Sequence, residues 1–178
     1  MGVQFIFVVE TNKGCKSDWI YIKETINHFY NYDNNVKLSE VYMDGKGRYK
    51  YKEKEIRSLV SQYKATSKDN QSKVIYCFDC DNYDTNQNDA MFLKNTRQYC
   101  KEKGYEFVWF CKDIEQVYIG KRVADKDKKK EAAKFKADNR ITGVEGSKLR
   151  ANNYRINMSN ILKILGNYNE FIPKKYSS

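Results

Sequence analysis

Acidic side chains follow two strongly apolar segments of the chain. Glu10 is the first charged residue after the apolar run 3–9. Asp79 ends the second run, 72–78, and Asp81 lies two positions later, where an extended chain would point it to the same side. Converging carboxylates repel one another unless a cation compensates them, and Mg²⁺ prefers such hard oxygen ligands. The pattern therefore predicts a Mg²⁺ (or Mn²⁺) site made of Glu10, Asp79 and Asp81, suited to phosphodiester hydrolysis.

These carboxylates need a scaffold that brings them to one edge. Four segments rich in β-branched and aromatic residues predict buried strands, at 3–9, 36–43, 72–78 and 105–110. The segments that follow them have helical spacing of apolar residues and predict helices at about 18–29, 52–65, 88–103 and 112–120. This alternation predicts an α/β, Rossmann-like single domain with a central four-stranded, mainly parallel sheet flanked by helices. In such a sheet the functional crevice lies at the carboxyl ends of the strands, where Glu10 and Asp79 are expected.

Local signals place the connections. Ser17 or Asp18 is expected to cap the first helix, and 44–48 is expected to form a turn. The turn is no phosphate-binding P-loop, because the chain contains no GxxxxGK[ST] pattern. The charge-rich segment 121–139 favours a solvated helix, and 159–166 predicts a last helix with an apolar face.

The basic charge is concentrated near the C-terminus. The net charge of the chain is +10, of which residues 1–120 contribute +1 and residues 121–178 contribute +9. We expect an α/β core at 1–120 and a basic helical extension at 121–178 that packs on it. A basic surface beside an acidic site suits a nucleic-acid partner, and the expected contacts are Lys128, Lys129, Lys130, Lys148, Arg150 and Arg155. A lysine-rich composition of the kind that AT-rich genomes encode explains the same charge equally well.

Cysteine content and hydropathy bear on location. The five cysteines are an odd number, which favours reduced thiols in the cytoplasm over a disulfide framework. Cys77 and Cys80 have the CxxC spacing, but no second pair follows and His28 is the single histidine, so zinc is not expected. The chain has no apolar run of about 20 residues and no basic leader at its start, and a non-exported protein without a membrane span is predicted.

The acidic motifs resemble those of a known family. A strand that ends in Glu, in the stretch 5–10, and a later strand that ends in DxD, in the stretch 74–81, are similar to the Toprim domains of topoisomerases, bacterial primases, small ribonucleases and overcoming-lysogenisation-type nucleases. The stretch 108–115, a strand followed by Glu115, resembles small RloB-like Toprim proteins associated with phage defence. The resemblance covers residues 1–120. It implies Glu10 as general acid/base or metal-linked residue, Asp79 and Asp81 as Mg²⁺ ligands, Glu115 as a fourth acidic participant, and a protein partner in a defence system.

Other functions fit part of the pattern. A topoisomerase would need a separate domain with a nucleophilic tyrosine, for which the chain has no room. A haloacid-dehalogenase-like phosphatase would use Asp79 as nucleophile, but it would need Ser or Thr where the next strand ends in Cys111, and it leaves Glu10 without a role. The glycine that follows Glu in Toprim domains is displaced here to Gly14, which favours a third alternative, a catalytically degenerate module that binds nucleic acid or a partner protein.

Overall fold

Four parallel strands form the centre of the protein. The computed structural model describes residues 1–175. The strands pair in the order β3-β1-β4-β5, all parallel; their bounds are β1 (Val3–Val9), β3 (Val36–Tyr42), β4 (Gln71–Asp79) and β5 (Glu106–Phe110). The predicted α/β class with a four-stranded parallel sheet is confirmed. A short antiparallel pair, β2 (Tyr30–Asn31) with β6 (Ile172–Pro173), was not predicted.

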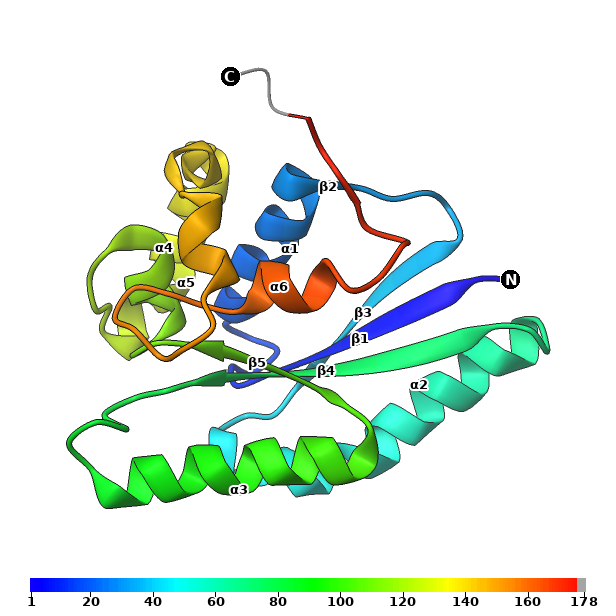
Figure 1. Ribbon diagram of the computed structural model, residues 1–178, viewed down its shortest axis with the longest axis horizontal. Helices are drawn as coiled ribbons and strands as arrows, with labels where there is room; N and C mark the ends of the chain where they lie inside the picture. The colour runs from blue at the N-terminus through cyan, green and yellow to red at the C-terminus, as the bar shows by residue number, and fades with distance from the viewer. Residues whose placement is uncertain (176–178) are drawn as a thin grey trace.

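Helices cover both faces of this sheet (Figure 1). One face carries α2 (Glu53–Thr66) and α3 (Gln87–Lys103). The opposite face carries α1 (Ser17–Phe29), α4 (Ile114–Ile119), α5 (Asp125–Ala137) and α6 (Ile161–Leu165). Three 3-10 helices complete the chain: η1 (Lys46–Lys52), η2 (Arg140–Gly143) and η3 (Gly146–Arg150). Within residues 1–175, no helix combines the length and the apolar character needed to cross a membrane.

Strand β1 is buried on both faces, as its uninterrupted apolar sequence predicts. Phe5, Phe7 and Val9 point into the core under α1, whereas Ile6 and Val8 point into the core above α2 and α3. Burial of each such side chain is worth about 1.5–3 kcal/mol relative to exposure. Because successive side chains alternate, a register shift of one residue would exchange the two cores, so the position of Glu10 at the end of β1 is strongly fixed.

The strand order places the end of β1 at a topological switch point. From β1 the chain crosses to β3 on one side through α1, and then returns past β1 to β4 on the other side through α2. The connections therefore leave the carboxyl ends of β1 and β4 in opposite directions, which is the arrangement at which open α/β sheets commonly bind ligands. Glu10 follows β1 and Asp79 is the last residue of β4, so both lie at this switch point.

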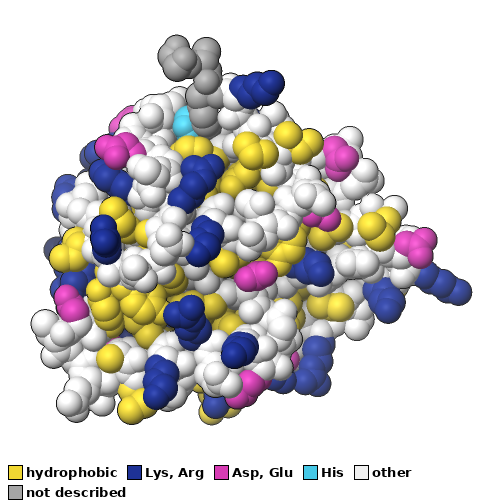
Figure 2. All heavy atoms as spheres, in the orientation of Figure 1, with side chains coloured by type: hydrophobic (Ala, Val, Ile, Leu, Met, Phe, Trp, Pro, Cys, Tyr) yellow, Lys and Arg dark blue, Asp and Glu magenta, His cyan; other side chains and the backbone are white. Residues whose placement is uncertain are grey.

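Residues 121–175 share the core of the first 120 residues. Ala132 and Phe135 of α5 are fully buried against α1, with the Phe135 ring 4.9 Å from Tyr21. Phe171 packs against Phe5 of β1 at a ring distance of 4.6 Å. Residues 176–178 of the predicted extension lie outside the described residues. Figure 2 shows Lys and Arg side chains spread over one face of the molecule rather than gathered in one patch.

The start of α1 differs from the prediction. Lys16 is the N-cap residue, in the left-handed region at φ 59°, and no side chain caps the helix, so the prediction of a Ser17 or Asp18 cap is wrong. Asp18 instead turns back and accepts a hydrogen bond from the Thr11 backbone N–H at 3.1 Å. The carboxylate thereby fixes the loop that follows Glu10, which connects the helix to the end of β1.

Candidate acidic active site

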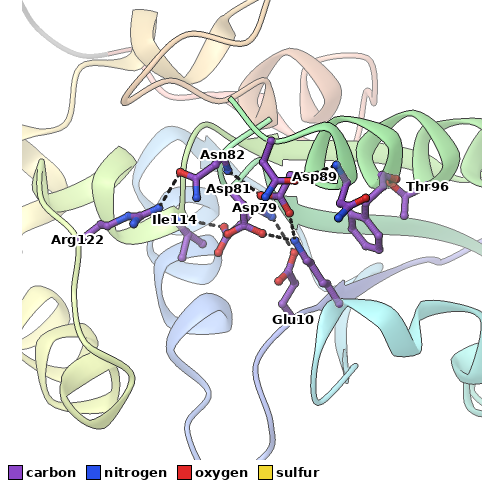
Figure 3. A network of polar contacts seen from close by, with 12 residues as sticks. Glu10, Asp79, Asp81, Asn82, Asp89, Thr96, Ile114 and Arg122 are labelled. Carbon is purple, nitrogen blue, oxygen red and sulfur yellow. Dashed lines mark hydrogen bonds and ion pairs between the residues drawn. The ribbon is translucent and has the colours of Figure 1, made fainter. Parts of the chain in front are cut away.

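Glu10 and Asp79 lie in direct contact at the ends of β1 and β4 (Figure 3). Glu10 Oε1 accepts a hydrogen bond from the Asp79 backbone N–H at 2.9 Å, which extends the ladder between the two strands through a side chain. Asp79 Oδ1 accepts a hydrogen bond from the Ile114 backbone N–H at 2.9 Å. Each carboxylate is therefore held by one oxygen, and Glu10 Oε2 and Asp79 Oδ2 are the atoms that could face a ligand.

Asp81 lies beside this pair but points differently. Its backbone is in the left-handed region at φ 48°, and its N–H donates to the Lys112 carbonyl at 2.6 Å. The prediction that the chain stays extended from Asp79 to Asp81 is therefore wrong: the turn at Asp81 removes the i, i+2 alignment. Asp81 remains close enough to Glu10 for its charge to raise the pKa of that carboxyl.

Lys46 supplies positive charge at this point. Its ammonium forms ion pairs with Asp81 and, at 3.0 Å, with Asp89, and it lies 4.9 Å from the centre of the Phe92 ring. The hydrogen bonds to the two carboxylates outweigh the effect of burial and raise the pKa of Lys46. The loop that carries Lys46 is fixed to the site, because the Gly45 N–H donates to the Glu10 carbonyl at 3.0 Å.

Burial and like charge raise the pKa values of the site carboxyls. Burial raises the pKa of Glu10 to about 8, with smaller contributions from Asp18 and Asp81. Burial, followed by the charges of Glu10, Asp18 and Glu115, raises the pKa of Asp79 well above its usual range. At neutral pH Glu10 can therefore hold or release a proton, which is the property required of a general acid or base.

Glu115 is close to the site but is not exposed in it. Its side chain is fully buried, and neither carboxylate oxygen has a hydrogen-bond partner within the described residues. Its counterion is Lys128 of α5, at 3.6 Å, and burial raises the pKa of Glu115 to about 7. Lys128, predicted to bind nucleic acid, thus points inward toward Glu115.

The other predicted nucleic-acid contacts are distributed over separate segments. Lys129 and Lys130 are exposed on α5, and Arg155 is exposed in the loop before α6. On η3, Lys148 pairs with Glu145 at 3.6 Å and Arg150 donates to the Gly146 carbonyl at 3.4 Å.

The site has donor atoms suited to Mg²⁺, although a complete set of protein ligands is not preformed. Within residues 1–175, no three Asp, Glu, His or Cys side chains are already arranged around one point that could hold a metal ion. Mg²⁺, however, is commonly bound by one or two carboxylates, with water and substrate phosphate completing the octahedron. Glu10 and Asp79 fit that requirement, since they are adjacent, hard, and short of compensating charge. Asp81 would join them on leaving Lys46.

Several members of the site were missed by reasoning from the sequence. Lys46 lies in the segment 44–48, which the sequence predicts only as a turn, although the glycines on both sides of Lys46 indicate a loop that can approach another segment closely. Asp89 lies in the first turn of α3, which Asn86 caps, and its carboxylate binds Lys46. Asp113 caps α4 by accepting from the Gln116 N–H at 2.8 Å.

No protein-family model, curated protein or solved structure matches this chain.

Proposed function

We propose that this protein hydrolyses phosphodiester bonds in nucleic acid at the site formed by Glu10, Asp79 and Asp81, with Mg²⁺ or Mn²⁺ as cofactor. The observation that carries the proposal is the contact of Glu10 with Asp79, two carboxyls of raised pKa, at the switch point of a parallel sheet. The resemblance of the strand-Glu and strand-DxD motifs to Toprim domains agrees with this assignment.

Each residue has a distinct role in the proposed reaction. Glu10, whose Oε1 accepts a hydrogen bond from the Asp79 N–H, takes a proton from the attacking water or returns one to the leaving oxygen through its other oxygen. Asp79 is oriented by the Ile114 N–H and, with Glu10, would hold the ion. Once bound, Mg²⁺ supplies charge stabilisation at the phosphate. Lys46, on the Asp81 side, can pair with a phosphate oxygen of the substrate.

A cleavage assay with matched variants tests the proposal. Purified protein is incubated with single-stranded and duplex RNA and DNA in Mg²⁺, in Mn²⁺ and in EDTA. Asp79→Asn removes the negative charge, while the amide oxygen can still accept the hydrogen bond from the Ile114 N–H. We expect the rate of cleavage to fall at least about a hundredfold. Asp69→Asn, an exposed aspartate before β4, is the control and should cleave like the wild type. Wild-type protein that leaves every substrate intact, or equal cleavage by Asp79→Asn, overturns the proposal.

A second function is favoured by one observation. Asp81 is already neutralised by Lys46, as expected of a module that binds nucleic acid without cleaving it. The same assay separates the two functions, because such a module would bind nucleic acid but would not cleave it in any of the metal conditions.

A further inference from the structure

Two adjoining cavities lie beside α3 on the face shown in Figure 2, outside the acidic site. Their volumes are about 620 and 650 Å³, and four residues line both of them: Tyr83, Arg97, Lys101 and Tyr154. We call this continuous depression the α3 groove. One wall is α3, and the other is built from the edge of β5, the loop 151–154 and the start of α6.

Aromatic rings in the α3 groove are held in fixed positions. The Tyr154 ring packs on Trp109 at 4.9 Å and on Tyr83 at 5.2 Å. The Tyr83 hydroxyl donates a hydrogen bond to the Tyr154 carbonyl at 3.1 Å. Both tyrosines are only partly buried and line the cavities, so they offer rigid aromatic surface to a ligand at little entropic cost.

Positive charge accompanies these rings. Lys94, Arg97 and Lys101 are exposed on α3 at spacings of three and four residues, so they lie along one side of the helix for about 10 Å. Lys163 of α6 lines the opposite wall. The acidic lining residue is Glu106, whose carboxylate accepts a hydrogen bond from the Tyr168 hydroxyl at 2.7 Å. The groove therefore attracts an anion along its length.

The α3 groove begins next to the acidic site. Tyr83 lies two residues after Asp81, and the Asn82 N–H between them donates to Asp89, the second partner of Lys46. A strand whose base stacks on Tyr83 would therefore have its backbone near the residues proposed to cleave it.

We propose that the α3 groove binds single-stranded nucleic acid, with bases stacked on Tyr83 and Tyr154 and phosphates on Arg97 and Lys101. The proposal rests on the proposed function in that the bound strand is the substrate of the acidic site. Aromatic stacking requires unpaired bases with an open face, whereas a duplex offers only its backbone and groove edges. The combination of aromatic platforms with a row of cations is the arrangement that single strands recognise.

A binding assay without metal tests the charges separately from cleavage. The full-length protein is titrated in EDTA with a fluorescent single-stranded oligonucleotide of about 12 nucleotides, as RNA and as DNA, and with the matching duplex. We expect the single strands to bind more tightly than the duplex. Arg97→Gln/Lys101→Gln should bind at least about tenfold more weakly, and its slope of log affinity against log salt should be smaller by about 1.4. Lys64→Gln/Lys68→Gln removes the same charge from exposed positions at the end of α2 and just after it, outside the α3 groove, and should bind like the wild type.

Two substitutions of Tyr83 test whether bases stack on its ring. Tyr83→Phe keeps the ring and loses the hydrogen bond to the Tyr154 carbonyl, so it should bind within about twofold of the wild type. Tyr83→Leu loses the ring and should bind at least about fivefold more weakly. Circular dichroism and thermal unfolding of both variants show whether the fold is kept, and Tyr83→Phe provides the comparison if Tyr83→Leu unfolds.

The possible results separate this proposal from the proposed function. Binding that depends on the α3 groove, with no cleavage of any substrate in Mg²⁺, supports the groove and refutes the nuclease. Cleavage that depends on Asp79, with wild-type binding by both groove variants, supports the nuclease and overturns the groove. Equal or tighter binding of the duplex also overturns it, as does a larger loss in Lys64→Gln/Lys68→Gln than in Arg97→Gln/Lys101→Gln.

Discussion

At the scale of single residues, the charge of Lys46 decides how the acidic site can be used. Lys46 neutralises Asp81 and Asp89, whereas burial and like charge keep the pKa values of the neighbouring Glu10 and Asp79 raised. A divalent ion at Glu10 and Asp79 would therefore meet an ammonium that already occupies Asp81. The lysine and the ion compete for the same carboxylate.

Replacement of Lys46 by methionine should tighten metal binding. A divalent ion about 5 Å from an ammonium is repelled by roughly 1.5 kcal/mol even in water, so removal of that charge should raise the affinity for Mg²⁺ or Mn²⁺ by about tenfold. Titration calorimetry of the metal-free protein measures this affinity. Lys50→Met, an exposed lysine of the same 3-10 helix, is the control and should leave it unchanged. Unchanged or weaker metal binding by Lys46→Met would show that Lys46 does not compete.

At the scale of secondary-structure elements, the outer edge of β5 is covered by the chain before α6, through a β-bridge between Phe110 and Ser159 and through the Asn160 side chain. β5 pairs with β4 on one side, and its other edge would expose unpaired backbone groups. Asn160 covers that edge: its Oδ1 accepts from the Trp109 N–H at 2.9 Å, and its Nδ2 donates to the Phe107 carbonyl at 3.0 Å. The side chain thus replaces a short piece of neighbouring strand.

Asn160→Ala should lower the free energy of unfolding by about 3 kcal/mol, because two backbone groups of β5 lose their partners and each costs about 1–3 kcal/mol when left unsatisfied. Urea denaturation, followed by the fluorescence of Trp19 and Trp109, measures the change. Asn167→Ala, at an exposed position after α6, should change stability by less than about 0.5 kcal/mol. A loss below about 1 kcal/mol in Asn160→Ala would mean that water or a shifted segment covers the edge equally well.

The elements themselves were predictable where a periodic pattern determines them. The apolar run of β1 and the helical spacing in α1 indicated both their type and, through the alternation of strands and helices, the parallel sheet with Glu10 and Asp79 at one end. The side-chain interactions across segments were not predictable. The left-handed turn at Asp81, the inward Lys128 and the approach of Lys46 to Asp81 depend on tertiary packing, which residue spacing along one segment does not encode.

At the scale of the whole molecule, the fold concentrates carboxylates at one end of the sheet and partly neutralises them from two sides. Lys46 approaches from the loop after β3, and Lys128 from α5. Burial, together with the like charge of neighbouring carboxylates, raises the pKa values of four of these carboxyl groups: Glu10, Asp18, Asp79 and Glu115. In each case the folded chain holds the proton more tightly than the unfolded chain, whose carboxyls titrate near 4 to 4.5.

The stability of the metal-free protein should therefore fall as the pH rises from about 5 to about 8. In this range the unfolded chain is already deprotonated, whereas the folded chain must release protons from Glu10, with its pKa of about 8, and Glu115, with its pKa of about 7. Below about pH 4 the trend reverses. Lys112 lowers the pKa of Asp84, and Lys46 and the Asn82 N–H lower the pKa of Asp89, so both aspartates lose favourable interactions when they are protonated. Thermal unfolding in EDTA across this pH range should show a maximum near pH 5.

Magnesium should change the pH dependence of thermal stability, and the change should identify where the ion binds. Because the ion binds deprotonated carboxylates, 10 mM Mg²⁺ should raise the melting temperature by several degrees at pH 8 and by much less at pH 5.5. Asp79→Asn removes one of the two proposed ligands together with part of the repulsion on Glu10, so it should be more stable than the wild type at pH 8 in EDTA and should gain little from Mg²⁺. Asp69→Asn should keep the full response. A Mg²⁺ effect of equal size at both pH values, or one retained by Asp79→Asn, would place the ion elsewhere and leave Lys46 and Lys128 as the cations of the acidic site.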